Sequence, residues 1–311
     1  MVGQILSTLL DVILPLSIPV AAGAVLVRFR KLETSHLLTL VLYFLAPVLI
    51  FRTLLTAQLS SGDVRDSLLF SLLNLALMWA LSAGLSRLLR LPPTETAGLS
   101  LVATLTNSVN YGLPLVLLAF GQAGLDKASV YVILQMIIVH TFGVFFAARS
   151  RFSVRGAIKS VFSLPALYAA VLAILLRVLG ITLPLGLEQG VSMVASAYSP
   201  VVLVVLGAQM ALVGQTAREH GPVPAFWAGL ALRMFLSPLV AWGCLLVLGV
   251  KGTSFPVLLV LASMPVAVNA VILAEKFDAA PRLVSRCILW TTLASFVTLP
   301  LLLTVVSPAV P

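Results

Sequence analysis

The chain has 311 residues, of which 60% are apolar and 9% are charged, and its formal net charge is +9. Its mean hydropathy of +1.14 excludes a soluble globular domain, in which each helix keeps a polar face toward water. The basic excess does not indicate a nucleic-acid partner, because most of it falls in short loops on one side of the predicted topology. We therefore predict an all-α membrane protein that crosses the bilayer many times.

Ten segments are apolar and long enough to cross the ~30 Å hydrocarbon core of a bilayer. In chain order they are residues 5–27, 36–58, 66–89, 95–119, 127–148, 157–179, 189–213, 223–249, 254–275 and 281–306. The first is not expected to be a removable signal peptide, because the basic residues Arg28, Arg30 and Lys31 follow it rather than precede it. Little of the chain is left for domains outside the membrane.

The distribution of lysine and arginine predicts the orientation. If residue 1 is outside, thirteen of the 19 lysines and arginines fall in inner loops and four in outer loops, which agrees with the positive-inside rule. The other two, Arg52 and Arg233, lie inside spans. We expect both termini to face the outside of a plasma membrane, such as the inner membrane of a bacterium.

Two apolar segments carry helix-breaking residues at matching places. Ser108–Pro114 reads Ser-Val-Asn-Tyr-Gly-Leu-Pro, and Ser263–Asn269, 155 residues later, reads Ser-Met-Pro-Val-Ala-Val-Asn. A proline inside a helix removes a backbone donor and clashes with the preceding turn. In hydrocarbon the freed polar groups must be satisfied by protein or by a water-filled cavity. Two such breaks in two halves of a chain indicate a transporter's binding site near the membrane midplane.

The basic loop at residues 149–159 divides the predicted spans into five and five. Because five is odd, the second half crosses the membrane in the opposite sense to the first. Pro47 in span 2 recurs as Pro200 in span 7, at nearly the same offset as the two breaks. We predict two inverted five-helix repeats, residues 1–148 and 157–311, joined by a cytoplasmic linker at 149–156.

Three stretches carry the most distinctive sequence. They are Leu40-Val-Leu-Tyr-Phe-Leu-Ala-Pro-Val-Leu-Ile-Phe51, Asn107-Ser-Val-Asn-Tyr-Gly-Leu-Pro114 with Phe120-Gly121, and Met264-Pro-Val-Ala-Val-Asn-Ala-Val-Ile-Leu-Ala-Glu-Lys-Phe277. At these stretches the chain resembles the auxin efflux carrier family, as a compact bacterial-type member of the bile acid/auxin carrier-like superfamily.

The resemblance implies a ten-helix fold in which helices 4 and 9 are broken and cross at the midplane. It also implies a scaffold of helices 1, 2, 6 and 7, a moving transport unit of helices 3–5 and 8–10, and a homodimer formed through the scaffold. The family includes plant auxin exporters, with a large loop between helices 5 and 6, and compact bacterial members associated with malonate and malate. Here that loop has about ten residues, which favours the compact form.

The physics of a helix break independently favours an anionic substrate. The second half of each broken helix begins with free N–H groups and a positive dipole end of about half a charge. Amide side chains at the breaks can add donors. The structural alternative is that these asparagines only cap freed backbone; we favour binding for Asn107 and Asn269 and leave Asn110 open. Candidate binding residues are therefore Asn107, Ser108, Asn110, Tyr111 and Asn269, and the residues expected to shape the breaks are Gly112, Pro114 and Pro265.

Two arginines within the spans are further candidates. Arg233 lies near the middle of span 8, where a basic side chain is costly unless it is paired or hydrated. It could neutralise the carbonyl end of a broken helix, gate the substrate electrostatically or snorkel to the interface. Arg52, near the outer end of span 2 with Asp63 and Asp66 close in sequence, is expected to snorkel or to guide an anion.

The remaining polar residues bear on ion coupling and on other possible functions. The acidic residues are Asp11 and residues at span ends or loops, which does not favour a dedicated sodium site, and uniport and proton coupling stay open. His140 is read as a packing residue. No enzyme motif, metal-ligand spacing or cofactor signature occurs. We predict a secondary transporter of a small organic anion, malonate-like, malate-like or auxin-like; the alternatives are an ion-coupled transporter of another solute, a passive channel and a membrane-embedded enzyme.

Overall fold

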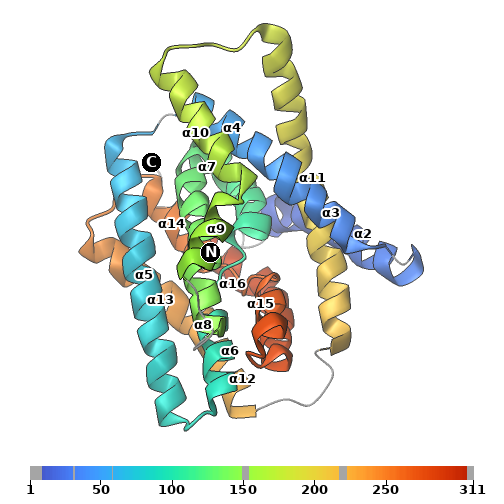
Figure 1. The fold of residues 1–311 in the computed structure, drawn as a ribbon, viewed down its shortest axis with the longest axis vertical. Helices are drawn as coiled ribbons and strands as arrows, with labels where there is room; N and C mark the ends of the chain where they lie inside the picture. Colours follow the sequence, from blue (N-terminus) through green and yellow to red (C-terminus); the bar gives the residue numbers. More distant parts are fainter. Residues whose placement is uncertain (1–8, 31, 58, 149–153, 217–222, 307–311) are drawn as a thin grey trace.

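The structure is a computed structural model, and it describes residues 9–30, 32–57, 59–148, 154–216 and 223–306. These ranges are helical almost throughout (Figure 1), which confirms the predicted all-α membrane fold. In chain order, the helices are α2 (Leu14–Arg30), α3 (Thr34–Leu40), α4 (Ala46–Thr56), α5 (Ser61–Leu88), α6 (Pro93–Thr104), α7 (Leu113–Ile138), α8 (Val144–Ala148), α9 (Val154–Phe162), α10 (Pro165–Val178), α11 (Leu185–Thr216), α12 (Val223–Ala231), α13 (Ser237–Val247), α14 (Ser254–Ala262), α15 (Ala270–Phe277) and α16 (Pro281–Val306). Wider π-helical turns join several of them: η1 (Leu9–Ile13), η2 (Val41–Leu45), η3 (Ser108–Gly112), η4 (Val139–Gly143) and η6 (Leu232–Leu236).

Within the described ranges, seven helices are long and apolar enough to cross a membrane, compared with the ten predicted spans. The difference has two causes. First, predicted spans 4 and 9 are each divided into two short helices. The second half of span 4 also runs on into span 5, so that residues 108–148 count as one helix, and Gly121 at φ 63° marks the turn between the two spans. Span 6 contributes the shorter helix α10, which has 14 residues.

The helices pack in two groups. In the first group, α11 packs against α2 and α4, and α4 packs against α10. In the second group, α5, α6, α7, α13, α14 and α16 pack mainly on one another. Figure 1 places α5 along one side of the molecule and α11 along the other, with α7 and α14 between them.

The contact between α2 and α11 depends on two glycines. A Cβ at Gly23 would lie 1.9 Å from the carbonyl oxygen of Val204, and a Cβ at Gly207 would lie 1.8 Å from that of Val20. Small residues that allow backbones to approach are the usual means of packing helices in lipid, where the hydrophobic effect does not drive association. The glycines therefore fix the first group as a closely packed unit.

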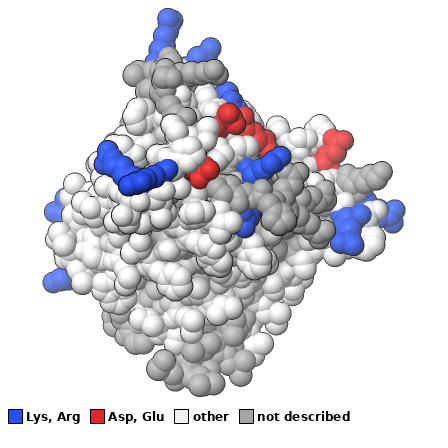
Figure 2. Space-filling model, turned by 90° about the horizontal axis from the view of Figure 1, so that it is seen from below, with Lys and Arg blue, Asp and Glu red and all other residues white. Residues whose placement is uncertain are grey.

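The core of the second group is formed by the two short helices that precede the breaks. Each residue of α14 from Val257 to Ala262 is 0% exposed, and Leu99, Leu101 and Leu105 of the α6 segment are also fully buried. A helix that is apolar on all sides belongs in such an interior. The outer helices instead present apolar side chains to the surroundings, and the face in Figure 2 is largely uncharged, with most charged residues in the upper half of that view.

Candidate functional site

The two helix breaks lie against each other. α6 ends at Thr104 and α14 ends at Ala262, and the extended segments that follow them form an antiparallel bridge between Thr106 and Val266. The N–H of Asn107 donates to the carbonyl of Pro265, and the N–H of Ala267 donates to that of Leu105, both at 2.9 Å. Each break thus satisfies the backbone of the other, as a break at membrane depth requires.

The first break lies slightly earlier than the sequence motif suggested. The non-helical residues are 105–107, whereas Pro114 sits at the start of α7, where its missing N–H costs little. The π-turn η3 joins the break to α7, and within it the N–H of Leu113 donates to the carbonyl of Ser108. Pro265, in contrast, lies inside the second break. Gly112 allows close packing, because a Cβ there would lie 2.7 Å from Cδ2 of Leu261.

The asparagine side chains do not cap the helices that follow the breaks. Asn107 precedes η3 and Asn269 precedes α15, and neither side chain makes a capping hydrogen bond. Nδ2 of Asn107 is buried and has no hydrogen-bond partner among the described residues. The carboxamide oxygen of Asn269 accepts a weak hydrogen bond, at 3.4 Å, from Nε2 of Gln209 on α11. The capping alternative raised by the sequence therefore has no hydrogen bond to support it.

The start of η3 presents several further donors. The N–H groups of Tyr111 and Gly112 donate to the carbonyl of Asn107. Those of Ser108, Val109 and Asn110 donate to no group in the described part of the chain, as expected for the first turn of a helix. Asn110 is 5% exposed and Ser108 is fully buried, whereas Val109 between them is partly exposed. Such a helix start attracts an anion.

The other two predicted residues of this segment have packing contacts. The Ser108 hydroxyl accepts a hydrogen bond from that of Thr106 at 3.1 Å. The ring of Tyr111 lies 6.2 Å from that of Phe296 on α16, and its buried hydroxyl has the side chain of Ser295, on the same helix, as its polar neighbour.

Arg233 joins the carbonyl ends of both broken helices. It lies in η6, is 1% exposed, and its Nη1 donates to the carbonyl of Ala103, in the last turn of α6, at 2.7 Å. Its Nη2 donates to the carbonyl of Ala262, the last residue of α14, and to the hydroxyl of Ser237. Of the three roles that the sequence left open, neutralisation of carbonyl ends is the one that these contacts support.

Comparison with known proteins agrees with this architecture. The sequence profile of a family described as membrane transport protein matches residues 22–156 and 149–303. The chain belongs to this family, that of the auxin efflux carriers.

This member of the auxin efflux carrier family is similar to two archaeal proteins, each described as an uncharacterized transporter. An uncharacterized transporter of Methanothermobacter thermautotrophicus is 29% identical over 279 residues, which cover 86% of this chain and 88% of the relative. An uncharacterized transporter of Methanocaldococcus jannaschii is 26% identical over 307 residues, covering 94% and 97%. Both likenesses extend over most of the chain and are not limited to one half of it.

Two polar residues of α11 contact the breaks in this carrier, and the sequence did not identify them as site residues. The hydroxyl of Tyr198 donates to the carbonyl of Val109 at 3.1 Å, and Gln209 contacts Asn269 as described above. Gln209 is 7% exposed, and its Oε1 has no hydrogen-bond partner among the described residues. A glutamine inside a predicted span, such as Gln209, indicates a polar environment. The sequence does not show that its partner is Asn269, 60 residues away.

Arg52 does not join the breaks. It is partly buried on α4 and forms no ion pair within the described ranges. The acids near it in sequence have other partners: Asp63 pairs with Lys127 at 2.6 Å and Asp66 with Arg65 at 2.9 Å. Neither acid is therefore paired with Arg52, and the expectation that Arg52 snorkels or guides an anion stays a prediction.

The remaining polar candidates lie in local contacts. Nδ1 of His140 is 2.9 Å from the carbonyl of Met136, one turn earlier, which fits a packing residue. Asp11 is exposed in η1. Within the described residues, no group of three or more His, Cys, Asp or Glu side chains is arranged to hold a metal ion.

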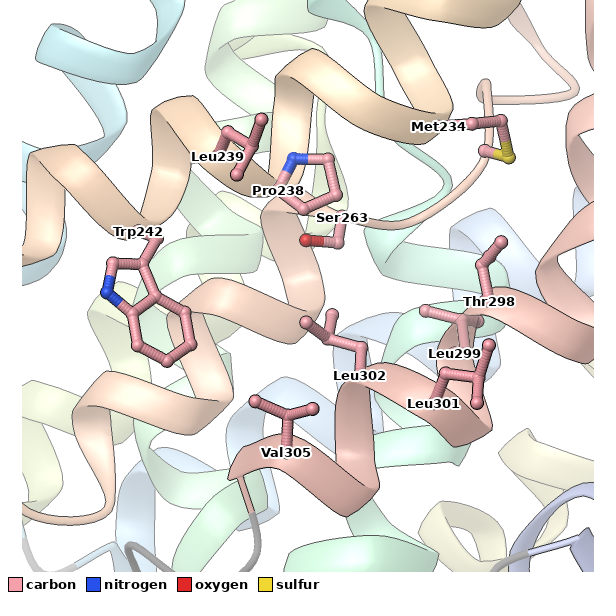
Figure 3. Close-up of a pocket in the computed structure, with 10 residues that line it drawn as sticks. All are labelled: Met234, Pro238, Leu239, Trp242, Ser263, Thr298, Leu299, Leu301, Leu302 and Val305. Carbon is pink, nitrogen blue, oxygen red and sulfur yellow. The ribbon is translucent and has the colours of Figure 1, made fainter. Parts of the chain in front are cut away.

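A cavity of about 320 Å³ lies beside the second break (Figure 3). Its lining is mainly apolar and comes from η6, α13 and α16, and from Ser263 at the end of α14. The Ser263 hydroxyl donates to the carbonyl of Leu259 at 2.7 Å, so it is already satisfied. Because the lining is mainly apolar, the paired breaks are the better candidate for holding a charged substrate. The lining residues are Met234, Pro238, Leu239, Trp242, Ser263, Thr298, Leu299, Leu301, Leu302 and Val305.

Proposed function

We propose that the protein is a secondary transporter that carries a small organic anion, a carboxylate, across the membrane by alternating access of an elevator type. The observation that supports this most directly is the set of unpaired donors at the first break. They are the N–H groups of residues 108–110 and Nδ2 of Asn107, and of these residues Asn107, Ser108 and Asn110 are buried.

These donors suit a carboxylate for two reasons. The start of a helix carries a partial positive charge, and its free N–H groups point outward along the helix axis. An amide donor beside it adds a directed hydrogen bond. The second break is followed by a second helix start, that of α15, with Asn269 before it. An anion can be held there without a lysine or arginine in direct contact.

The packing of the helices supports a division into a fixed and a moving part. We propose that α2, α3, α4, α9, α10 and α11 form the scaffold and that spans 3–5 and 8–10, which comprise α5–α8 and α12–α16, form the transport unit. In this proposal residues 1–148 and 157–311 are the two inverted repeats. A homodimer through the scaffold and termini on the outer face belong to the same proposal.

Among the residues that the structure describes, two side chains of α11 form hydrogen bonds between the two parts. Tyr198 and Gln209 of α11 donate one hydrogen bond each to the transport unit, to Val109 and Asn269. A hydrogen bond of this kind contributes about 1 kcal/mol net, so exchanging the two for others costs little. A substrate can then shift the balance between the two positions only through its different affinity for each.

Counterflow in proteoliposomes tests the proposal. Vesicles containing the purified protein are loaded with one carboxylate, and uptake of the same labelled carboxylate is measured against empty vesicles. A carrier shows saturable uptake that is accelerated by internal substrate, and Asn107→Ala abolishes it while Gln189→Ala, at an exposed position of α11, does not. Uptake that is never accelerated from the far side indicates a channel, and chemical change of the substrate indicates an enzyme; either outcome rejects the proposal.

A further inference from the structure

Four helix ends meet at the paired breaks, and their partial charges have opposite signs. α6 and α14 end there with carbonyl groups, whereas η3, continued by α7, begins with the unpaired N–H groups of residues 108–110, and α15 begins with a turn whose first N–H groups donate to the carbonyls of residues 267–269. Each carbonyl end is equivalent to about half a negative charge and each N–H end to about half a positive charge. Taken alone, the four ends sum to about zero.

Arg233 changes this balance. Its guanidinium donates to one carbonyl in the last turn of α6 and to one at the end of α14. Ser237 supports the same arrangement, because its hydroxyl donates to the carbonyl of Ala262 at 2.8 Å. One full positive charge, buried at 1% exposure, therefore offsets the two carbonyl ends.

The two N–H ends are then left with about one positive charge between them. The unpartnered Nδ2 of Asn107, 3% exposed as a residue, lies at the first of these ends and points independently to a missing acceptor. Asp126 is the other charged residue that is buried within the described ranges. It accepts a hydrogen bond from Gln122, one turn away on α7, and lies outside the paired segments.

We infer that the proposed carboxylate site accepts one negative charge, and that Arg233 sets this limit by cancelling the two carbonyl ends, so that the substrate is a monocarboxylate and not a dicarboxylate. The inference rests on the proposed function and narrows it. A second carboxylate in the same buried place would have no positive charge left to balance it, and burying an unbalanced charge is strongly unfavourable.

Matched ligand pairs test the inference on the wild-type protein. Each straight-chain dicarboxylate from malonate to pimelate, and phthalate, is compared with its monomethyl ester, which keeps the carbon skeleton and loses one charge. Affinity is measured by thermal shift and titration calorimetry at a pH at which all carboxylates are ionised. We expect the monoester to bind at least tenfold more tightly in every pair that binds.

A dicarboxylate that binds as tightly as its monoester, or more tightly, overturns the inference while leaving anion transport in place. If no acid of either kind binds or is exchanged in counterflow, the proposed function itself fails and the inference fails with it. The two failures are therefore distinguishable in one set of measurements.

The role of Arg233 is tested through charge preference rather than activity alone. In Arg233→Gln the breaks should carry no net positive charge, so the preference for the monoester over the uncharged dimethyl ester should fall at least tenfold, whereas Arg233→Lys should retain it. An unchanged preference in a folded Arg233→Gln variant overturns the assignment to Arg233. If that variant does not fold, the wild-type ligand pairs still decide whether the site takes one charge.

Discussion

The backbone N–H of Asn107 donates to the carbonyl of Pro265 at 2.9 Å, across 158 residues of chain. The backbones of the two breaks pair with each other here, while the side chain of Asn107 does not cap η3. Its amide nitrogen is left buried and without a partner. A buried donor without an acceptor costs free energy, and such a cost is most easily understood where a ligand supplies the acceptor.

The first prediction concerns the two asparagines at the helix starts. Asn107→Ala and Asn269→Ala should each weaken carboxylate binding at least tenfold, about 1.4 kcal/mol, because each removes an amide next to a positive helix end. Expression and the melting temperature should stay near those of the wild type, since neither side chain caps a helix. Thermal-shift titration measures both quantities, and wild-type affinity in both variants would reject a binding role for these residues.

A second prediction concerns how transport depends on Arg233. Arg233→Lys should keep part of the transport rate, because the required feature is a buried positive charge and an ammonium can donate to at least one of the two carbonyls. Arg233→Leu and Arg233→Glu should transport far more slowly, with Glu placing a negative charge against two carbonyl ends. Initial uptake rates in proteoliposomes, normalised to reconstituted protein, give the comparison. Equal transport by Arg233→Leu would remove this residue from the mechanism.

The positions of the breaks could be anticipated from the sequence, but their geometry could not. Proline and asparagine in long apolar segments mark places where a helix cannot continue unaided, and this located both breaks near Asn107 and Pro265. The sequence motif included Pro114, yet the chain accommodates that proline at the start of α7 through the π-turn η3, and the true break lies at residues 105–107. A proline restricts a helix locally, while the tertiary pairing decides which residues are extended.

The destination of the Arg233 side chain was likewise beyond sequence reasoning. The position of Arg233 in the middle of span 8 indicated that its charge needs partners. These partners are backbone carbonyls 130 and 29 residues away, and because every residue has a backbone carbonyl, the sequence does not show which ones are used. The same holds for Gln209 and Asn269, whose contact depends on how α11 packs against the second break.

A third prediction concerns the stability of the first packing group. Gly207→Val should lower the melting temperature strongly, because the added Cβ would lie 1.8 Å from the carbonyl oxygen of Val20 and α2 would have to move away. Overpacking of this kind typically costs about 1–3 kcal/mol. Gly190→Ala is the matched control on the same helix, because a Cβ there meets nothing within 4 Å. If Gly207→Val melts like the control, close contact between α2 and α11 does not hold this part of the protein together.

The last prediction is that the paired breaks become accessible alternately from the two sides of the membrane. Single cysteines are introduced at Val109 and at Ala267, both partly exposed and each next to a break. The background lacks the two native cysteines, Cys244 and Cys287, which are buried and free. Labelling by an impermeant thiol reagent is measured from each side, with and without a transported carboxylate.

If the second group of helices moves relative to α11, the contacts of Tyr198 with Val109 and of Gln209 with Asn269 must break as the site changes sides. Substrate should then raise labelling of both cysteines from one side and lower it from the other. A cysteine at Lys251, exposed in the loop before α14, should label from a single side at a rate that substrate does not change. Accessibility of Val109→Cys and Ala267→Cys that is equally insensitive to substrate from both sides would rule out alternating access by this movement.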